Sequence, residues 1–266
     1  EYRAHVASYL FAEYAVGRTP NPDVLCNDKV KFPLLWREAQ KWGCDYIATG
    51  HHVRKRKKNT SYELLSGKDQ NKDQSYFLHR LTQEDLAHTL FPIGEYTKAE
   101  VRAIARTQSL PTADKRSTRG LCFIGKVKMP AFLGQAVPLQ PGPIYTTNGT
   151  HIGEHRGLAP YTIGQRHGFG GGGGTPYFVV EKDSASNTLI VANEEDEPKY
   201  RAVSCEVSPH HPAKAGGAGQ AGVRFQVEIP AGGLKCMARV RYRAPLCEVR
   251  IMNNESGVVE NQSIIP

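Results

Sequence analysis

The sequence has no apolar run near the roughly 18 residues that a membrane-spanning helix needs, and no pattern of a secretory signal peptide. It has only six cysteines among 266 residues, at uneven spacings. So few cysteines exclude a disulfide-rich scaffold and favour a reducing compartment. An initial methionine is also lacking, and the end at Pro266 completes no obvious element, so we expect a fragment of a longer protein.

Positive charge is in excess, with 34 Lys and Arg against 26 Asp and Glu and a formal net charge of +8. This balance favours a polyanionic partner. Five consecutive cations occupy Arg54 to Lys58, and the run fits either the solvated tip of a hairpin or a contact to nucleic-acid phosphates. Hydrophobic residues make up 39% of the chain, which is enough for packed cores.

The first part of the chain has the pattern of a parallel α/β fold. Apolar spacing predicts a helix over His5 to Val16, and another from Asp28 or Pro33 to Trp42. Prolines and an Asn-Pro step predict a loop between them, over Gly17 to Asp23. Asp45 to Gly50 is typical of a buried strand, and a helix followed by a buried strand and a glycine turn favours a parallel sheet.

The pattern changes beyond Gly120, where glycine and proline become frequent and short alternating runs predict strands. Before that point, Thr97 and Glu100 form a capping-box signature that predicts a helix to Gln108. We therefore expect an α/β fold followed by an all-β part. The expected divisions are residues 1–118, 119–198 and 199–266, the last being an incomplete β-barrel.

Cys26 closes a proline-stiffened segment and is expected just ahead of a helix, with Lys29 and Lys31 nearby. That setting should lower the pKa of the Cys26 thiol and make thiolate available near neutral pH. Asp23, three residues earlier, is a candidate to hold a proton. The alternative is a proline-braced turn around a buried structural cysteine.

Cys122 lies at the change in pattern, flanked by glycines and by basic residues. A thiol in an electropositive, glycine-rich segment suits redox or sulfur-carrying chemistry. An ordinary core cysteine beside Leu121 and Phe123 is the alternative. His51 and His52 lack zinc spacing to any cysteine pair, so we predict no protein metal site.

Several motifs together resemble one family, the tRNA-specific 2-thiouridylases (the MnmA/TrmU family). They are G-R-T-P-N-P-D-V-L-C-N at Gly17 to Asn27, A-T-G-H-H at Ala48 to His52, N-K-D-Q-S-Y-F-L at Asn71 to Leu78, G-L-C-F-I-G at Gly120 to Gly125, Y-T-I-G-Q-R at Tyr161 to Arg166 and R-V-R-Y-R at Arg239 to Arg243. They occur in the family's order over essentially the whole chain. The first and fourth are highly specific.

The resemblance implies an ATP-dependent sulfur transfer to C2 of the wobble uridine of tRNA, giving 2-thiouridine. ATP, with Mg²⁺, adenylates the uridine oxygen. The family's persulfide cysteine matches Cys122, and its nucleophilic cysteine matches Cys26, which can form a disulfide with Cys122. A persulfide is a soft nucleophile at neutral pH, and adenylation turns the ring oxygen into a leaving group, so the chemistry is self-consistent.

Further site residues follow from the resemblance only. The target base would meet Asn21, Pro22 and Asp23, with Asp23 handling a proton, and ATP would contact Gly50. The tRNA-contacting residues would be Lys72, Asp73, Gln74, Arg241 and Tyr242.

The family's phosphate-cradling S-G-G-x-D-S loop and its terminal barrel strands are not found in this sequence. The resemblance thus implies the remainder of a pyrophosphatase-loop domain at 1–118, with ATP binding and activity of this chain alone in question. Two other functions stay open: a catalytically inactive tRNA-binding fragment, and another pyrophosphatase-loop ligase acting on a small molecule. Implied partners are tRNA and a sulfur donor, either a cysteine desulfurase or a sulfur-relay protein. We expect a monomer away from membranes, in the cytoplasm or, in a eukaryote, the mitochondrion.

Overall fold

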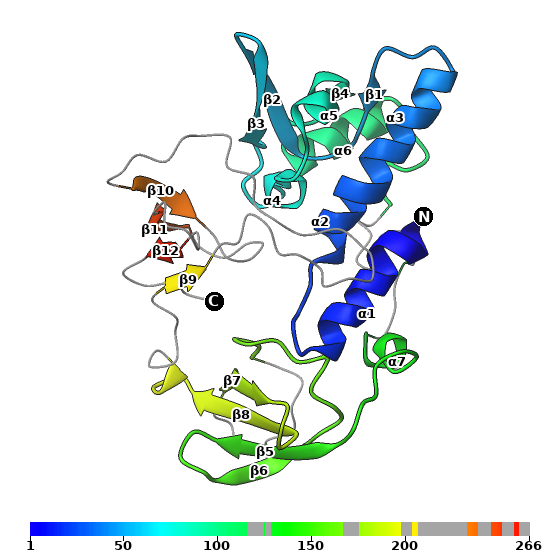
Figure 1. Ribbon diagram of the computed structural model, residues 1–266. Coiled ribbons are helices and arrows are strands. Elements are labelled where there is room, and N and C mark those ends of the chain that lie inside the picture. Colours follow the sequence, from blue (N-terminus) through cyan, green and yellow to red (C-terminus); the bar gives the residue numbers. More distant parts are fainter. Residues whose placement is uncertain are drawn as a thin grey trace. The chain divides into compact units, whose positions relative to one another are not determined.

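The computed structural model describes residues 1–115, 125, 129–166, 176–197, 204–206, 233–238, 246–251 and 258–260 (Figure 1). The chain divides into two units. The first comprises Glu1–Ala7 and Asn21–Lys126, and the second comprises Ser8–Pro20 and Val127–Pro266. Among the described residues, no helix combines the length and the apolar character needed to traverse a membrane.

A run of helical turns opens the first unit. Its elements are η1 (Arg3–Ala7), α2 (Pro22–Cys26), η2 (Asn27–Lys31) and α3 (Phe32–Lys41), where η marks a π-helical turn. α2, η2 and α3 follow one another as one continuous rod (Figure 1). Gly43 follows the rod at a φ of +69°, a left-handed conformation that glycine adopts readily and that ends many helices.

The rod begins earlier than we expected from the sequence, which predicted a loop through Asp23 and a helix from Asp28 or Pro33. That prediction is wrong because Asn21-Pro22, interpreted as a helix breaker, starts a helix. Asn21 is the N-cap, and Pro22 occupies the first turn, where its missing N–H would have had no helical partner anyway. Pro33 lies in the first turn of α3, directly after the π-helical turn η2, where the Phe32 N–H bonds to the Asn27 carbonyl oxygen five residues back and the regular four-residue pattern is interrupted.

Two small sheets complete the strands of this unit. β1 (Ile47–Ala48) and β4 (Thr89–Leu90) pair in parallel, as predicted for the first of them. β2 (Val53–Lys58) and β3 (Ser61–Ser66) form an antiparallel hairpin. The five cations lie along β2 and not at the hairpin tip, which corrects their expected placement. Gly94 permits a close backbone approach to β2, since a Cβ there would lie 1.8 Å from the carbonyl oxygen of Val53.

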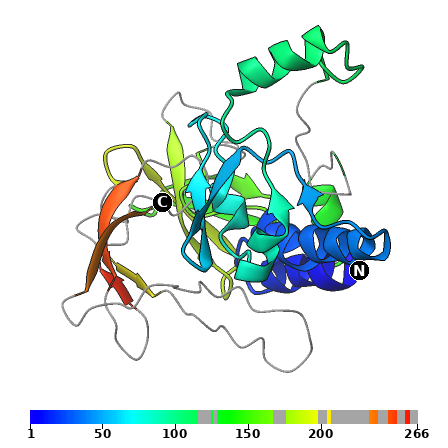
Figure 2. The same cartoon turned by 90° about the horizontal axis from the view of Figure 1, so that it is seen from above.

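Three short helices accompany the sheets: α4 (Ser75–Leu78), α5 (Gln83–Ala87) and α6 (Lys98–Thr107). The predicted capping box is confirmed, because the Glu100 N–H donates to Oγ1 of Thr97 at 3.2 Å and the Thr97 N–H donates to the Glu100 carboxylate. None of the α6 residues is buried. The helix stands apart from the other elements of its unit (Figure 2).

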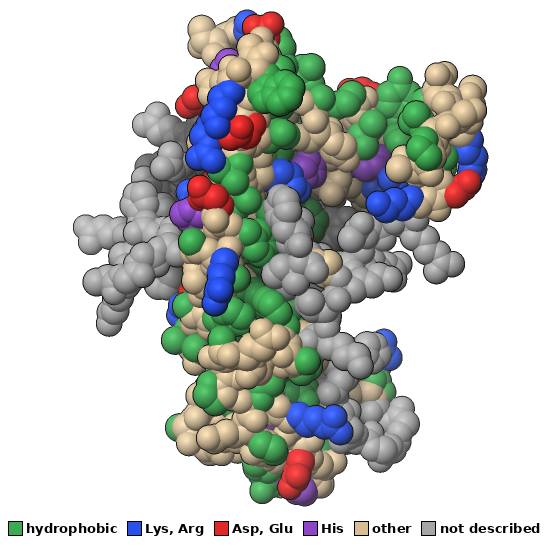
Figure 3. Space-filling view, turned by 90° about the vertical axis from the view of Figure 1, so that its right-hand side faces the viewer, with side chains coloured by type: hydrophobic (Ala, Val, Ile, Leu, Met, Phe, Trp, Pro, Cys, Tyr) green, Lys and Arg blue, Asp and Glu red, His purple; other side chains and the backbone are tan. Residues whose placement is uncertain are grey.

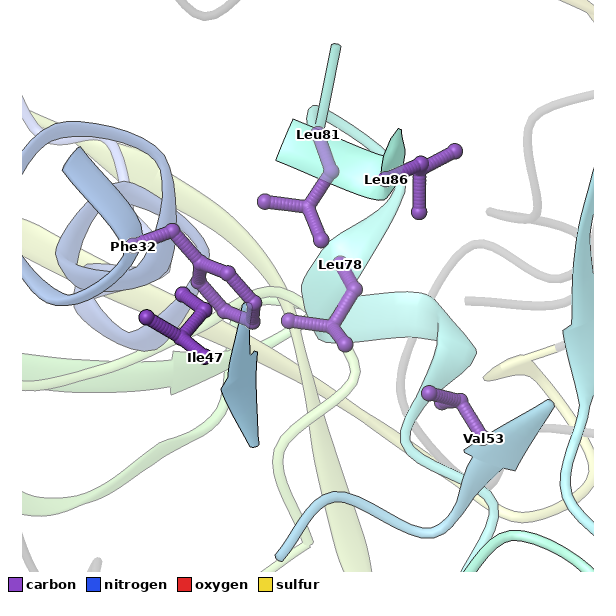
Figure 4. Packing of buried hydrophobic residues seen from close by; sticks show 6 residues of the cluster. All are labelled: Phe32, Ile47, Val53, Leu78, Leu81 and Leu86. Carbon is purple, nitrogen blue, oxygen red and sulfur yellow. The ribbon is translucent and has the colours of Figure 1, made fainter. Parts of the chain in front are cut away.

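The core of the first unit joins the rod to the strands. It consists of Phe32, Ile47, Val53, Leu78, Leu81 and Leu86 (Figure 4). Phe32 begins α3 and is 1% exposed, so its burial contributes about 1.5–3 kcal/mol and fixes the rod against β1. This packing determines where the residues just before Phe32 and just after β1 lie.

The described part of the second unit is mainly β. Its helices are α1 (Ser8–Ala15) and α7 (Met129–Leu133). One sheet has the order β6-β5-β8-β7 and the other β10-β11-β12-β9. Their bounds are β5 (Gly142–Thr146), β6 (His151–His155), β7 (Tyr177–Asp183), β8 (Thr188–Asn193), β9 (Ser204–Glu206), β10 (Leu234–Ala238), β11 (Cys247–Ile251) and β12 (Val258–Glu260). An α/β part followed by a β part is confirmed, and the described strands form no closed barrel.

Candidate functional site

The cysteine of the first motif lies inside the rod. The Asn21 side-chain oxygen accepts hydrogen bonds from the N–H groups of Asp23 at 3.1 Å and Val24 at 3.3 Å, which caps α2. Cys26 is the last residue of α2 and is 0% exposed. The expectation that Cys26 precedes a helix is therefore wrong, because the capped helix starts five residues before it, at Asn21. A buried cysteine is confirmed, and any chemistry at its sulfur needs local opening.

Asp23 and Cys26 lie on the same side of α2, because residues three apart on a helix are neighbours. Oδ1 of Asp23 is buried and has no hydrogen-bond partner among the described residues. A buried carboxylate oxygen without a hydrogen-bond partner lowers the stability of the folded protein unless a bound group donates a hydrogen bond to it. The arrangement therefore presents an acceptor that a bound group could satisfy, on the same helical side as the thiol.

Two polar contacts tie the rod next to Cys26 to α4 and to the residues that follow α4. Nδ2 of Asn27 donates to the carbonyl oxygen of Phe77 at 3.2 Å. Nε of Arg80 lies 2.8 Å from Oδ2 of Asp28, and both side chains are nearly buried, at 12% and 11% exposure. The structure thus holds the end of the N-K-D-Q-S-Y-F-L motif against the cysteine motif. Sequence reasoning missed Arg80, because no local signal pairs it with Asp28.

Lys72, Asp73 and Gln74 form the loop that leads into α4. Asp73 is 5% exposed, and its Oδ1 accepts hydrogen bonds from the N–H groups of Gly67 at 3.0 Å and Ser75 at 3.1 Å. The Gln74 side-chain oxygen accepts from the N–H of His52 at 2.9 Å. These internal contacts shape the loop, and Lys72 is its half-buried cation.

Gly50 lies at the carboxyl edge of the parallel pair. The N–H of Thr49 donates to the carbonyl oxygen of Leu90 at 3.0 Å. This bond extends the β1–β4 pairing to Thr49, the residue before Gly50. Among the described residues, a Cβ at Gly50 would meet only Cδ1 of Ile93, at 4.0 Å, which is an ordinary van der Waals contact. Ligands of parallel α/β sheets bind outside the carboxyl ends of the strands, and Gly50 is in that position.

His51 turns inward directly after Gly50. Its Nδ1 lies 3.0 Å from Oγ1 of Thr49, and its ring stacks on Phe32 with centroids 5.6 Å apart. Burial, reinforced by the positive charges of Lys31 and His52, lowers the pKa of His51 to about 4. His51 is therefore neutral at physiological pH. The sequence considered this histidine only as a metal ligand, and the described residues contain no cluster of three metal-ligating side chains.

We expect the free energy of unfolding to decrease as the pH falls from about 6.5 to about 4. Over this range the unfolded chain binds a proton at His51, whereas the folded chain does not. The neutral, buried His51 therefore contributes about 3 kcal/mol to the free energy of unfolding, and this contribution is fully present above a pH of about 6.5. Urea denaturation at several pH values measures it. His51→Gln should lose this part of the pH dependence, and His79→Gln, at an exposed histidine, should keep it. An unchanged slope in His51→Gln would contradict the expectation.

The remaining predicted site residues, Cys122, Arg241 and Tyr242, lie outside the described residues. Three other cysteines have described environments. Cys44 is exposed, Cys236 is half-buried with its thiol pKa raised by burial, and the Cys247 thiol is 3.3 Å from the carbonyl oxygen of Ala238.

Comparison with known proteins finds two family models that match consecutive parts of the chain. Residues 1–126 match the family model described as the tRNA methyl transferase HUP domain, and residues 130–193 match the tRNA methyl transferase PRC-barrel domain. A protein of Yersinia enterocolitica named tRNA-specific 2-thiouridylase MnmA is 44% identical over 249 residues, covering 91% of this chain and 64% of the relative.

Proteins of the same name show similar identity in other bacteria. That of Paraburkholderia xenovorans is 46% identical over 91% of this chain and 62% of the relative. That of Pseudoalteromonas translucida is 41% identical over 97% of this chain and 69% of the relative. The chain thus spans slightly less than two thirds of the first two relatives.

Proposed function

Because the chain belongs to the tRNA-specific 2-thiouridylase family, we propose that it acts in ATP-dependent sulfur transfer to C2 of the wobble uridine of tRNA, giving 2-thiouridine. The observation that carries this proposal is the arrangement around α2. One capped helix places an unsatisfied Asp23 oxygen and the Cys26 thiol on the same side. Asn27 of η2, directly after that helix, donates a hydrogen bond to Phe77 of the Asn71 to Leu78 motif, and Asp28 pairs with Arg80 just beyond the motif.

In the proposed reaction ATP is a substrate that adenylates O2 of the uridine and releases pyrophosphate. The terminal sulfur of a persulfide on Cys122 then attacks C2, and AMP leaves with the former O2 oxygen of the uridine. The Cys26 thiolate attacks Sγ of Cys122, which breaks the sulfur–sulfur bond, leaves sulfur on C2 and forms a Cys26–Cys122 disulfide. Asp23 accepts the proton of the Cys26 thiol. Reduction of the disulfide and reloading of Cys122 by the sulfur donor complete the cycle.

The nucleotide is proposed to bind at the carboxyl edge of β1 and β4, where Gly50 allows the backbone to approach it. Mg²⁺ would accompany the ATP phosphates, because this ion is usually held by substrate phosphates together with one or two carboxylates. We also propose that the first unit belongs to the pyrophosphatase-loop class. The proposed domains are residues 1–118, 119–198 and 199–266.

The target uridine is proposed to meet Asn21, Pro22 and Asp23, since a base must leave its stack to reach a buried thiol. Lys72, Asp73, Gln74, Arg241 and Tyr242 are the proposed tRNA-contacting residues, with Asp73 and Gln74 holding the loop that presents Lys72. Figure 3 shows Lys and Arg side chains at the surface, and exposed cations of this kind can contact RNA phosphates.

The proposed partners are tRNA and a sulfur donor, either a cysteine desulfurase or a sulfur-relay protein, and the proposed state is a monomer. The proposed location is the cytoplasm, or the mitochondrion in a eukaryote. A persulfide and a thiolate require a reducing compartment, which supports both locations.

A hybrid protein tests the proposal. This chain would replace the matching segment of the Yersinia relative and be expressed in a bacterial strain without its own thiouridylase. Mass spectrometry of tRNA nucleosides should detect 2-thiouridine, and the purified hybrid should form it only when ATP and a sulfur donor are present. A hybrid that binds tRNA without forming 2-thiouridine would instead support the inactive tRNA-binding function. A hybrid that neither binds nor modifies tRNA would contradict both.

A further inference from the structure

The side-chain amide of Asn27 has a fixed orientation in the fold. Asn27 is 3% exposed, and its Nδ2 donates to the carbonyl oxygen of Phe77 at 3.2 Å. Turning the amide over would place its oxygen against that carbonyl oxygen, and two acceptors repel each other. The Phe77 contact therefore directs Oδ1 of Asn27 away from this carbonyl. Oδ1 is buried and has no hydrogen-bond partner among the described residues.

A second unpaired oxygen lies one turn earlier on the rod. The Asn27 N–H donates to the carbonyl oxygens of Asp23 and Val24, so the side chains of Asp23 and Asn27 are neighbours along the helix. Oδ1 of Asp23 is also buried, and it has no partner in the part of the chain that the structure describes. Cys26 directly precedes Asn27 and is itself one turn after Asp23. The rod thus places two acceptors without donors next to the thiol.

The two oxygens determine the kind of ligand that fits them. An amide oxygen and an ionised carboxylate oxygen only accept hydrogen bonds, so the ligand must be a donor. A phosphate would bring further acceptors and negative charge to a carboxylate, which is unfavourable, whereas an N–H group would satisfy a buried oxygen. The base of uridine has one N–H, at N3 on its Watson–Crick edge, which is the edge that proteins read on an unstacked base.

The fixed amide of Asn27 also distinguishes uracil from cytosine. Cytosine has no hydrogen on N3, so it presents an acceptor where uracil presents a donor. An asparagine that could turn its amide over would serve either base, because the group carries both an acceptor and a donor. The Phe77 carbonyl already takes a hydrogen bond from Nδ2 and so removes this choice. A site of this kind rejects an analogue that leaves its buried polar atom unpaired.

We propose that Asn27 determines the specificity for uracil and that its Oδ1 accepts the N3–H of the target base, an inference that rests on the proposed function. Reaction at the buried Cys26 thiol already needs local opening, and Asn27 is the next residue, so one opening brings the base to both. Asp23 keeps its proposed role toward the proton of the thiol. The Phe77 carbonyl holds the Asn27 amide for this contact, which gives the Asn71 to Leu78 motif a part in choosing the base.

Binding of anticodon stem-loop RNAs to the hybrid protein, without ATP or a sulfur donor, tests the inference. The wobble position carries uridine, cytidine or N3-methyluridine, which lacks the N3–H. The hybrid with the unchanged chain should bind the uridine RNA about tenfold or more tightly than either of the other two. Asn27→Leu, whose side chain has a similar size but no acceptor, should bind the three RNAs with nearly equal affinities.

Leu86→Ala is the control for lost stability, because Leu86 is 3% exposed in the core of the same unit and takes no part in the proposed site. It should lower the melting temperature of the hybrid and keep the preference for the uridine RNA. The ratio of affinities is the decisive measurement, since a purely structural role of Asn27 would weaken binding of all three RNAs equally and leave the ratio unchanged.

An unchanged preference in Asn27→Leu would overturn the inference and leave a buried water as the partner of Oδ1. An unchanged chain that binds the three RNAs equally, or binds none of them, would overturn it as well. The proposed function is judged separately, by 2-thiouridine formation. A hybrid that prefers the uridine RNA but forms no 2-thiouridine contradicts the proposed function alone, and one that forms 2-thiouridine without the preference contradicts this inference alone.

Discussion

Cys26→Ala in the hybrid protein should abolish 2-thiouridine, with a loss of at least about a thousandfold. The reason is that the proposed resolution step needs a thiolate to attack Cys122, and no other described cysteine lies on α2 with Asp23 three residues before it. Mass spectrometry of the tRNA measures the product, and tRNA binding by the purified variant should be nearly unchanged. The methyl group of alanine fits the fully buried position without introducing a polar atom.

Cys44→Ser is the matched control, because Cys44 is exposed in the same unit and far along the chain from the first motif. It should keep wild-type levels of 2-thiouridine. Full product with Cys26→Ala would remove Cys26 from the mechanism and leave it a structural role. An equal loss with Cys44→Ser would instead indicate general damage to the fold.

Arg80→Met should destabilise the chain by about 1–3 kcal/mol, because the nearly buried Asp28 carboxylate loses its partner at 2.8 Å and keeps Lys29, at 3.3 Å, among the described cations. In a unit of this size, such a change lowers the melting temperature by several degrees. Urea denaturation and thermal melting both measure it. Because Asp28 lies two residues after Cys26, the variant should also lower 2-thiouridine formation in the hybrid.

Arg106→Met is the control for the Arg80 variant. Nε and Nη2 of Arg106 contact Asp114, the closer at 2.7 Å, but the two side chains are 60% and 79% exposed. Exposed pairs contribute only about 0–1 kcal/mol, so this variant should melt close to the wild type. A double variant, Asp28→Leu with Arg80→Met, should recover part of the lost stability, because it also removes the nearly buried carboxylate that has lost its arginine partner. Similar losses for Arg80→Met and Arg106→Met would show that the buried pair has no special role.

The sequence predicted best what depends on neighbouring residues. Thr97 and Glu100 are three positions apart, so their capping box could be identified without knowing the rest of the fold. Asn21-Pro22 was misinterpreted because the same dipeptide serves turns and helix starts, and packing of the following apolar residues decides between them. The Asp28–Arg80 pair and the burial of Asp73 depend on distant segments meeting, which no local pattern encodes.

For the candidate site residues too, the sequence indicated positions in the chain but not their burial or their contacts with distant segments. Local chemistry indicated Cys26 and Asp23, and the family resemblance added Gly50, but neither decided whether Cys26 is buried or indicated that an Asp23 oxygen lacks a partner. The stacking of Phe32 on the His51 ring is a contact between the rod and the strand exit, so it also depends on segments that are distant in the sequence.

The parallel pairing of β1 with β4 also has a kinetic consequence. The hairpin of β2 and β3 and the helices α4 and α5 lie between the two strands in sequence, so β1 and β4 can meet only after a long loop closes. Loop closure of this kind loses chain entropy before any contact compensates for it, whereas the hairpin closes locally and early. We therefore expect the edge that carries Gly50 to form late in folding, on a hairpin and rod that are already in place.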